Sequence, residues 1–460
     1  MDTRTETDSL GTVEIPSARL WGPQTERARH LFAIGTEQFP PLLIRALGLQ
    51  KWAAAEANAR LGLLPRPLAD AIQQAAEEII AGRRDADFPL PVWQTGSGTQ
   101  TNMNANEVIA NRANQLLGAP LGARAPVHPN DHVNLGQSSN DSFPTVMHLA
   151  AAEAALRHLI PALAVLAASL ERRAAEWAPI VKLARTHLMD AVPTTLGALF
   201  ATAARQVRHG IARIEATRPR LLELPQGGTA AGTGLNRHPE FDCLFCTIVA
   251  ARTGLAFTPN PDKSEGMAAH DALLELHGAL SVIAAGLMKL GNDVRLLGSG
   301  PRAGIGELIL PEEGLSSSIM PGKTNPTQCE ALTMVCAQVM GNQTTVALAC
   351  AQGHLELNTF KPVIIQAVLQ SARLLGDAAA GFARHMVDRL APNRARVAEN
   401  LAKSLMLATA LNPHIGYDRA VRVAKRALAE DLTLREAARR EGVAEADFDA
   451  WVRPEAMLRP

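Results

Sequence analysis

Apolar residues recur at alternating steps of three and four along much of the chain. The clearest line covers more than three heptads and comprises Leu273, Leu276, Leu280, Ile283, Leu287, Leu290, Val294 and Leu297. This spacing places an apolar stripe along one helix that packs nearly parallel or antiparallel to its neighbours. The pattern predicts a long helix within a bundle.

Other segments extend this reading to a mainly helical chain. A second apolar line begins just after Pro193 and Thr194, ends before Pro219, and comprises Leu196, Phe200, Ala203, Val207, Ile211 and Ile214. Helices are also expected over residues 142–177 with a break at Pro161, over 326–350, and over about 358–387. These segments predict an all-α fold with about five long central helices.

The two ends of the chain carry shorter segments. Near the N-terminus, Leu64, Leu68, Ile72 and Ile79 mark one face of a helix. Past Pro392 the pieces are small, and one opens with a capping box at residues 433–436. We therefore predict three domains: an N-terminal domain over residues 1–137, a central helical bundle over 138–395, and a small helical domain over 396–460.

Composition indicates a soluble globular protein without an obvious polyanionic partner. Hydrophobic residues make up 47% of the 460 residues, and 45 Lys plus Arg balance 45 Asp plus Glu. No long single-sign block appears, so neither nucleic acid nor an anionic membrane is expected as a partner. The odd number of cysteines, five, favours a reducing compartment, and we expect a cytoplasmic protein.

Targeting and membrane segments are not expected from the sequence. The first ten residues are polar, lack the apolar core of a signal peptide and are too acidic for a transit peptide. The longest apolar stretch, residues 159–170, contains Pro161 and Ser169. It is shorter than the roughly 20 residues that span a bilayer.

Polar, Gly-rich and His-rich runs lie between the predicted helices or at their ends. They are TGSGTQTNMNANE (95–107), HPNDHVNLGQSSND (128–141), RTHLMD (185–190), GGTAAGTGLN (227–236) and SSSIMPGKTNPTQCE (316–330). Loops at the ends of a rigid bundle are where binding and catalytic groups concentrate. We expect the functional site in these runs.

The last of these runs has the chemistry of an anion-binding loop at the start of a helix. Small residues let backbone amides approach a ligand, Lys323 supplies a compact positive charge, and Asn325 is an N-cap candidate before Pro326. Glu330 then falls about one turn into the helix, where it can hold another group. A flexible surface loop before a capped helix explains the same residues equally well.

The motifs together resemble one known family. SSIMPGK followed by NPTQCE resembles the signature of the fumarase/aspartase superfamily. The other motifs resemble class II fumarases in the family's order: GSGTQTNMNANEVIANRA, HPND, QSSND, RTHLMDAVPTTLG, GTAAGTGLN, ELNTFKP and ALNPHIGYD. The resemblance runs from residue 21 to about residue 454, nearly the whole chain. It implies a three-domain all-α chain and a homotetramer with a core of about twenty helices.

The resemblance also implies a reaction. Class II fumarases add water to fumarate in the anti sense to give L-malate, through a carbanion whose charge spreads into the adjacent carboxylate. Ser317 would exchange the C3 proton, although a free serine is a weak base and must be activated by nearby amides and Lys323. His187 would act on water, and Glu330 would fix its tautomer. From the residues alone, a turn serine and a structural histidine remain the simpler readings.

Substrate binding and an accessory site follow from the same resemblance. The residues implied to bind the carboxylates are Ser97, Gly98, Thr99, Ser138, Ser139, Asn140, Thr186, Ser318, Lys323 and Asn325. Neutral donors with one cation suit a dianion that must bind and still leave. The residues that resemble the family's accessory anion site are His128, Pro129, Asn130 and Asp131, although a His beside an Asp is equally a structural turn.

No metal or cofactor is expected. His238, His270, His354 and His414 form no HExxH pair, so they are read as structural. Cys243 and Cys246 have CxxC spacing without a second pair. No GxGxxG run indicates a dinucleotide.

Several departures and rivals stay open. Ser316, Gly136 and residues 197–200 differ from the usual class II fumarase pattern, so a related dicarboxylate is conceivable. Aspartate ammonia-lyases run similar carbanion chemistry, but they typically have Gln in place of His187 and PAK in place of residues 321–323. A catalytically silent scaffold is a third possibility. Within the implied homotetramer, each site would draw loops from three subunits.

Overall fold

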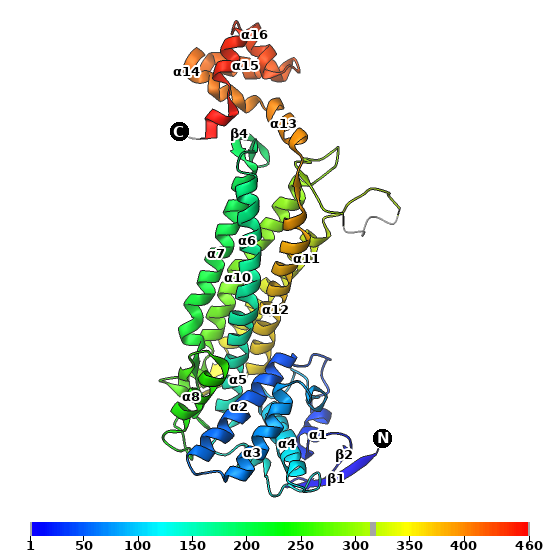
Figure 1. Ribbon diagram of the computed structural model, residues 1–460, viewed down its shortest axis with the longest axis vertical. Coiled ribbons are helices and arrows are strands. Elements are labelled where there is room, and N and C mark those ends of the chain that lie inside the picture. The colour runs from blue at the N-terminus through cyan, green and yellow to red at the C-terminus, as the bar shows by residue number, and fades with distance from the viewer. Residues whose placement is uncertain (1, 313–318, 459–460) are drawn as a thin grey trace. The chain divides into compact units, whose positions relative to one another are not determined.

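The computed structural model of the chain describes residues 2–312 and 319–458 (Figure 1). The chain is mostly helical (63%), which confirms the prediction of a helical fold with long helices. In the described part, five sheets occur and each has two strands. Ser317 and Ser318, both predicted site residues, lie outside the described residues.

The chain divides into two compact units. The first comprises residues 1–161, 212–282 and 338–376, and the second comprises 162–211, 283–337 and 377–460. Four long helices contribute residues to both units: α7 (Leu196–Leu221), α10 (Asp271–Leu297), α11 (Thr327–Cys350) and α12 (Lys361–His385). The three-domain division drawn from the sequence stays a prediction.

The first unit begins with the antiparallel hairpin of β1 (Thr3–Asp8) and β2 (Gly11–Pro16). Its helices are α1 (Pro23–Leu31), α2 (Pro41–Arg60), α3 (Arg66–Ile80), α4 (Thr99–Leu116), α5 (Ser139–Glu153), α8 (Phe241–Thr253) and α9 (Lys263–Ala268). Helix α2 packs against α3, α5 and α8, so it lies at the centre of this unit. Short strands add the pairs β5 (Glu223–Leu224) with β6 (Thr258–Pro259), and β8 (Gly353–His354) with β9 (Leu357–Asn358).

The second unit contains α6 (Ile160–Glu176) and the antiparallel hairpin of β3 (Val181–Thr186) and β4 (Met189–Thr195). Strand β7 (Leu308–Ile309) pairs with β10 (Ala391–Pro392). The small helices that follow are α13 (Arg394–Lys403), α14 (Asn412–Ile415), α15 (Tyr417–Ala429), α16 (Leu434–Arg440) and α17 (Glu445–Trp451). Leu411, Val423 and Phe448 are among the residues of a separate apolar core for these helices.

Most helix predictions hold because the local pattern is strong. All eight stripe positions of α10 are buried, and the capping box forms between Thr433 and Glu436. The predicted break at Pro161 is a π-helical segment, Ala154–Leu159, between α5 and α6. Pro161 has no N–H to pair with the carbonyl four residues earlier, and a wider turn accommodates that loss. The prediction that α7 ends before Pro219 is wrong, since the helix continues to Leu221.

Three described helical stretches are long and apolar enough to cross a membrane, judged by length and composition only: Ser139–Glu176, Asp271–Leu297 and Lys361–Arg389. Between 50% and 56% of each apolar window is already buried inside the protein. Packing therefore accounts for about half of that apolar surface. The prediction of no membrane segment rested on the stretch at residues 159–170. By length and composition alone, these three longer helices do not meet the reason given for it.

Candidate active site

The start of α4 carries the predicted residues Ser97, Gly98 and Thr99. Gly98 has a left-handed φ of 76°, and a Cβ at this position would lie 2.4 Å from the ring of Phe143. Only glycine fits both the backbone conformation and the space. The hydroxyls of Ser97 and Thr99 lie 2.8 Å apart. A close approach to α5 therefore fixes this turn.

The start of α5 carries Ser138, Ser139 and Asn140. Ser138 is the N-cap and forms a capping box with Asp141. Ser139 Oγ accepts a hydrogen bond from Asn102 Nδ2 of α4 at 3.0 Å, and Asn140 Nδ2 donates to the carbonyl of Ala230 at 2.9 Å. The structure thus brings six predicted binding residues, from two runs about forty positions apart, into one cluster of donors at two helix N-termini.

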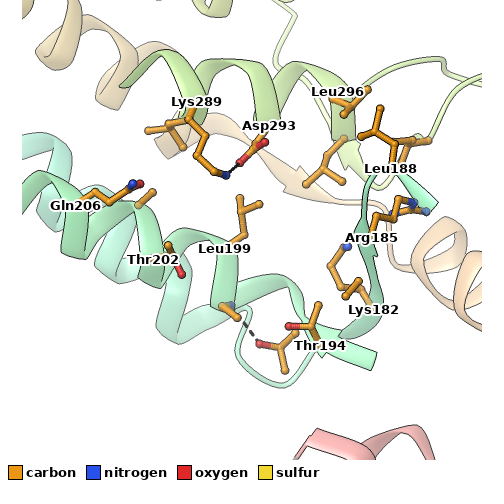
Figure 2. Close-up of a pocket in the computed structure, with 17 residues that line it drawn as sticks. Lys182, Arg185, Leu188, Thr194, Leu199, Thr202, Gln206, Lys289, Asp293 and Leu296 are labelled. Atoms are coloured by element: carbon orange, nitrogen blue, oxygen red, sulfur yellow. Dashed lines mark hydrogen bonds and ion pairs between the residues drawn. The ribbon is translucent and has the colours of Figure 1, made fainter. Parts of the chain in front are cut away.

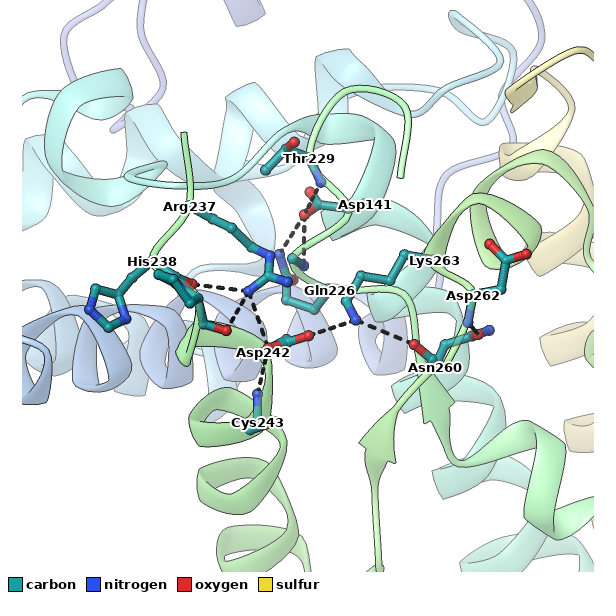
Figure 3. A network of polar contacts seen from close by, with 12 residues as sticks. Asp141, Gln226, Thr229, Arg237, His238, Asp242, Cys243, Asn260, Asp262 and Lys263 are labelled. Atoms are coloured by element: carbon teal, nitrogen blue, oxygen red, sulfur yellow. Dashed lines mark hydrogen bonds and ion pairs between the residues drawn. The ribbon is translucent and has the colours of Figure 1, made fainter. Parts of the chain in front are cut away.

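A buried carboxylate that the sequence analysis did not single out supports this cluster. Asp141 Oδ1 accepts from the amide of Ser138, and Oδ2 accepts from the amides of Gly227 and Thr229, each at 2.9 Å (Figure 3). Burial raises the pKa of Asp141 to about 6, against the opposing effect of these hydrogen bonds. Asp141 thereby joins the start of α5 to the Gly-rich loop at 227–236.

The predicted accessory residues lie together in a single turn. His128 precedes the π-helical turn Pro129–Val133, which contains Asn130 and Asp131. His128 Nε2 lies 2.9 Å from Arg124 Nη2, and Nδ1 lies 3.1 Å from an Asp131 carboxylate oxygen. Since arginine only donates, Nε2 accepts and the ring is neutral. The backbone amides of Asn130 and Asp131 also point at Nδ1, at 3.3 and 3.2 Å, so His128 caps the π-helical turn. Burial lowers the pKa of His128, which favours this neutral form.

The cavity beside this turn is small. Pro129, Asn130 and Arg124 line a space of about 20 Å³, together with the carboxylates of Glu6, Asp8 and Glu107. This volume is close to that of one water molecule, and the acidic lining opposes an anion. Any anion at the accessory residues would therefore have to bind at the outer face of the turn.

Thr186 and His187 lie in the β3–β4 hairpin, a structure that the sequence analysis did not predict. Thr186 pairs with Met189, so His187 and Leu188 form a two-residue turn, with left-handed φ values of 56° and 61°. Both values are typical of a type I′ turn, which usually carries Asn or Gly. Non-glycine residues are strained there, and such strain clusters at functional positions.

The hairpin is held by a buried carboxylate. Glu307, with no exposed side-chain surface, lies 3.1 Å from Lys182 Nζ and 2.9 Å from Arg185 Nη1. Asn400 Nδ2 of α13 donates to the same carboxylate at 3.1 Å. Burial lowers the pKa of Lys182, and the charge of Glu307 opposes that effect. Arg185 immediately precedes Thr186, so this ion-pair cluster fixes the base of the predicted catalytic turn.

Residues of the β3–β4 hairpin, α7 and α10 line a cavity of about 370 Å³ (Figure 2). Lys182 and Arg185 line one end, and the ion pair of Lys289 and Asp293 lies at another part of the wall. Leu188 also lines it. None of the predicted site residues in the described part of the chain lines this cavity, although Arg185 and Leu188 flank Thr186 and His187.

The remaining predicted residues precede or begin α11. Lys323 and Glu330 are exposed, and the amide of Lys323 donates to the carbonyl of Met320 at 3.2 Å. The predicted N-cap position is wrong by one residue: α11 begins at Thr327, so Pro326 precedes it and the carbonyl of Asn325 accepts from the Thr327 amide at 2.9 Å. Among the described residues, no hydrogen bond or ion pair joins His187 to Glu330 within this chain.

Comparison with known proteins places the chain in a family. Residues 11–341 match a family described as lyase, and residues 407–459 match the fumarase C C-terminus. The chain belongs to the fumarase/aspartase family of lyases.

Close relatives cover the whole chain. Fumarate hydratase class II 2 of Bradyrhizobium diazoefficiens is 56% identical over 459 residues, which are 100% of this chain and 97% of the relative. Fumarate hydratase class II of Methylorubrum extorquens is 56% identical over 461 residues, covering 100% and 98%. The crystal structure of a class II fumarase from Schistosoma mansoni matches with a TM-score of 0.96 and 41% identity over 99% of each chain.

Proposed function

We propose that the chain is a class II fumarate hydratase, a hydro-lyase that reversibly adds water to fumarate to give L-malate in the tricarboxylic acid cycle. The observation that carries the proposal is the joined pair of helix starts, at Ser97–Thr99 and Ser138–Asn140, in a chain 56% identical to class II fumarate hydratases over its full length. Helix N-termini and neutral donors together suit a small carboxylate.

Substrate binding is assigned to several neutral hydrogen-bond donors and one lysine ammonium. The hydroxyls and amides at the starts of α4 and α5 bind one carboxylate of the substrate, and Thr186, Ser318, Lys323 and Asn325 complete the recognition. One ammonium among neutral donors holds a dianion without binding it so tightly that release becomes slow. This combination of one cation with neutral donors favours a substrate that enters and leaves with two negative charges.

Catalysis follows from the need for groups on opposite faces of the double bond. His187 takes a proton from water as the oxygen adds to C2, and the electron pair of the double bond moves to C3 and into the adjoining carboxylate. Ser317 then supplies the proton to C3 from the other face. Glu330 of another subunit orients His187, because a carboxylate on one ring nitrogen raises the basicity of the other.

We infer a homotetramer whose sites each draw on three subunits. In support, His187, Lys323 and Glu330 are all exposed in the isolated chain. Large apolar side chains are exposed on the hairpin and the long helices: Leu188, Met189, Val192, Val282, Leu296, Met334 and Leu348. Association would cover this surface and bring the separate groups together. We expect a soluble, cytoplasmic enzyme that needs no cofactor.

A role for His128, Pro129, Asn130 and Asp131 in an accessory anion site is also proposed, with Arg124 as its cation. The neutral His128 and the neighbouring carboxylates weaken such a site, so we expect lower affinity there than at the active site.

An absorbance assay with purified protein tests the function. We expect turnover of fumarate and of L-malate, followed at the absorbance of the fumarate double bond. L-Aspartate serves as the alternative substrate, since an ammonia-lyase would form fumarate from it. Activity with L-aspartate alone would overturn the hydratase proposal, and inactivity with all three would favour a silent scaffold.

A further inference from the structure

A buried chain of side chains leads from Lys51 to the hydroxyl of Ser139. Lys51 Nζ, on α2, donates to Asn134 Oδ1 at 3.0 Å and to Gln137 Oε1 at 2.9 Å. Asn102 Nδ2, on α4, lies 3.2 Å from the same Asn134 oxygen and 3.0 Å from Ser139 Oγ. Two asparagine-mediated steps thus separate the lysine ammonium from a predicted substrate-binding hydroxyl.

The polarity of these bonds determines what Ser139 can do. A lysine ammonium and an amide nitrogen only donate, so Asn134 Oδ1 is the shared acceptor and Ser139 Oγ accepts from Asn102. The hydroxyl hydrogen of Ser139 is then available for an acceptor on the other side. A substrate carboxylate is such an acceptor, and it lies where the helix dipole also favours negative charge.

Lys51 is expected to destabilise the folded protein. Its side chain is completely buried, and its hydrogen-bond acceptors are neutral amides. The charge that most affects it belongs to Asp141, but that carboxylate is occupied by the amides of Ser138, Gly227 and Thr229. Burial without a directly bonded carboxylate destabilises an ammonium and lowers the pKa of Lys51 to about 7.

Such a residue is more easily explained by a role in the site than by stability. We propose that Lys51 is a positioning residue for the hydratase reaction proposed above. Its ammonium fixes Asn134, and thereby Asn102, so that Ser139 presents its hydroxyl hydrogen to a substrate carboxylate. The positive charge also lies behind the dianion's binding site. The inference rests on the proposed function, and it concerns a residue that does not touch substrate.

Lys51→Met provides the first test, because methionine fills similar space without donors or charge. We expect the KM for fumarate and for L-malate to rise about tenfold, which is the effect of losing one well-oriented hydrogen bond to a charged group. The kcat should change much less, since the reacting groups are untouched. The melting temperature should stay the same or rise, whereas a merely structural lysine would lower it and leave KM unchanged.

A matched pair on α4 keeps the test decisive if Lys51→Met does not fold. Asn102 and Asn104 are both completely buried on the same helix, but Asn104 Nδ2 donates to the carbonyl of Asp87 at 2.9 Å and has no bond to Ser139. Asn102→Ala should raise KM as Lys51→Met does. Asn104→Ala, the control, should keep KM near the wild-type value.

The outcomes separate the two proposals. If the wild-type protein turns over fumarate but folded Lys51→Met keeps its KM, or Asn104→Ala raises KM as much as Asn102→Ala, the positioning role is wrong and the hydratase proposal stands. If the wild-type protein neither turns over fumarate nor L-malate nor binds fumarate in calorimetry, the proposed function is wrong and the role of Lys51 falls with it.

Discussion

Arg185 Nη1 lies 2.9 Å from a carboxylate oxygen of Glu307, whose side chain has no exposed surface. This ion pair joins the segment before β7 to the hairpin that carries Thr186 and His187. The Glu307 carboxylate binds two cations of β3 and the Asn400 amide of α13, so it connects three separate segments of the chain. Its removal should therefore affect both stability and activity.

Glu307→Gln should lower the free energy of unfolding by about 3–5 kcal/mol, because two buried cations lose their counter-charge. Activity should fall further than the folded fraction does, since the base of the His187 turn is released. Denaturant unfolding and kcat measurements check this. Glu171→Gln is the control: Glu171 pairs with Arg208 at the surface, so about 0–1 kcal/mol is expected. Equal effects of the two changes would contradict the anchoring role.

Gly98→Ala should impair the start of α4. The added Cβ would lie 2.4 Å from the Phe143 ring, and φ is 76°. We expect a loss of about 1–3 kcal/mol in unfolding free energy and a higher KM for fumarate. Gly118→Ala is matched in backbone conformation, with φ 81°, but its Cβ would meet nothing within 4 Å. Gly118→Ala should thus show only the backbone effect, about 1 kcal/mol, and normal KM.

His187→Asn should separate chemistry from folding. Asparagine tolerates the left-handed φ of 56°, so the melting temperature should hardly change. The kcat should fall by about 10²- to 10⁴-fold, the usual contribution of a general acid or base. His187→Val would lose the same activity and also lower the melting temperature, since a β-branched residue is strained at this φ. A normal kcat for His187→Asn would exclude the proposed role on water.

Lys361 offers a prediction on pH. Its side chain is completely buried, Nζ donates to the carbonyl of Met267 at 2.9 Å, and burial lowers its pKa from 10.5 to about 7. Because the folded-state pKa is below the unfolded value, the stability is present above about pH 10.5 and is lost as pH falls to about 7.

Lys361→Met removes this titration. The unfolding free energy of the variant, relative to wild type, should therefore increase as pH falls from 10 to 7 and level off below 7. Denaturant unfolding at several pH values measures this difference. The pH dependence, not the absolute offset, is the test, because the variant also loses pH-independent hydrogen bonds. A difference that does not vary with pH would contradict the lowered pKa.

Local patterns in the sequence determined a large part of this protein. The apolar stripe of α10, the capping box at Thr433 and the break before Pro161 each depend on residues within a few positions of one another. Such features are set by helix geometry and side-chain chemistry, so they could be predicted correctly. The polar runs predicted where the site lies, and the family resemblance supplied the proposed roles of Ser317, His187 and Lys323; these roles stay predictions.

Only the tertiary structure decided which of these residues meet. Asn102 binds Ser139 across 37 positions, and Lys51 reaches Asn134 across 83. The only sign of this network in the sequence was the run of asparagines at 102, 104 and 106, which are buried in α4. The turn at His187 could not be predicted from the sequence either, because strand pairing depends on residues that are not sequence neighbours. Sequence determines what each segment tends to form, whereas burial and pairing between distant segments decide which polar groups remain available for chemistry.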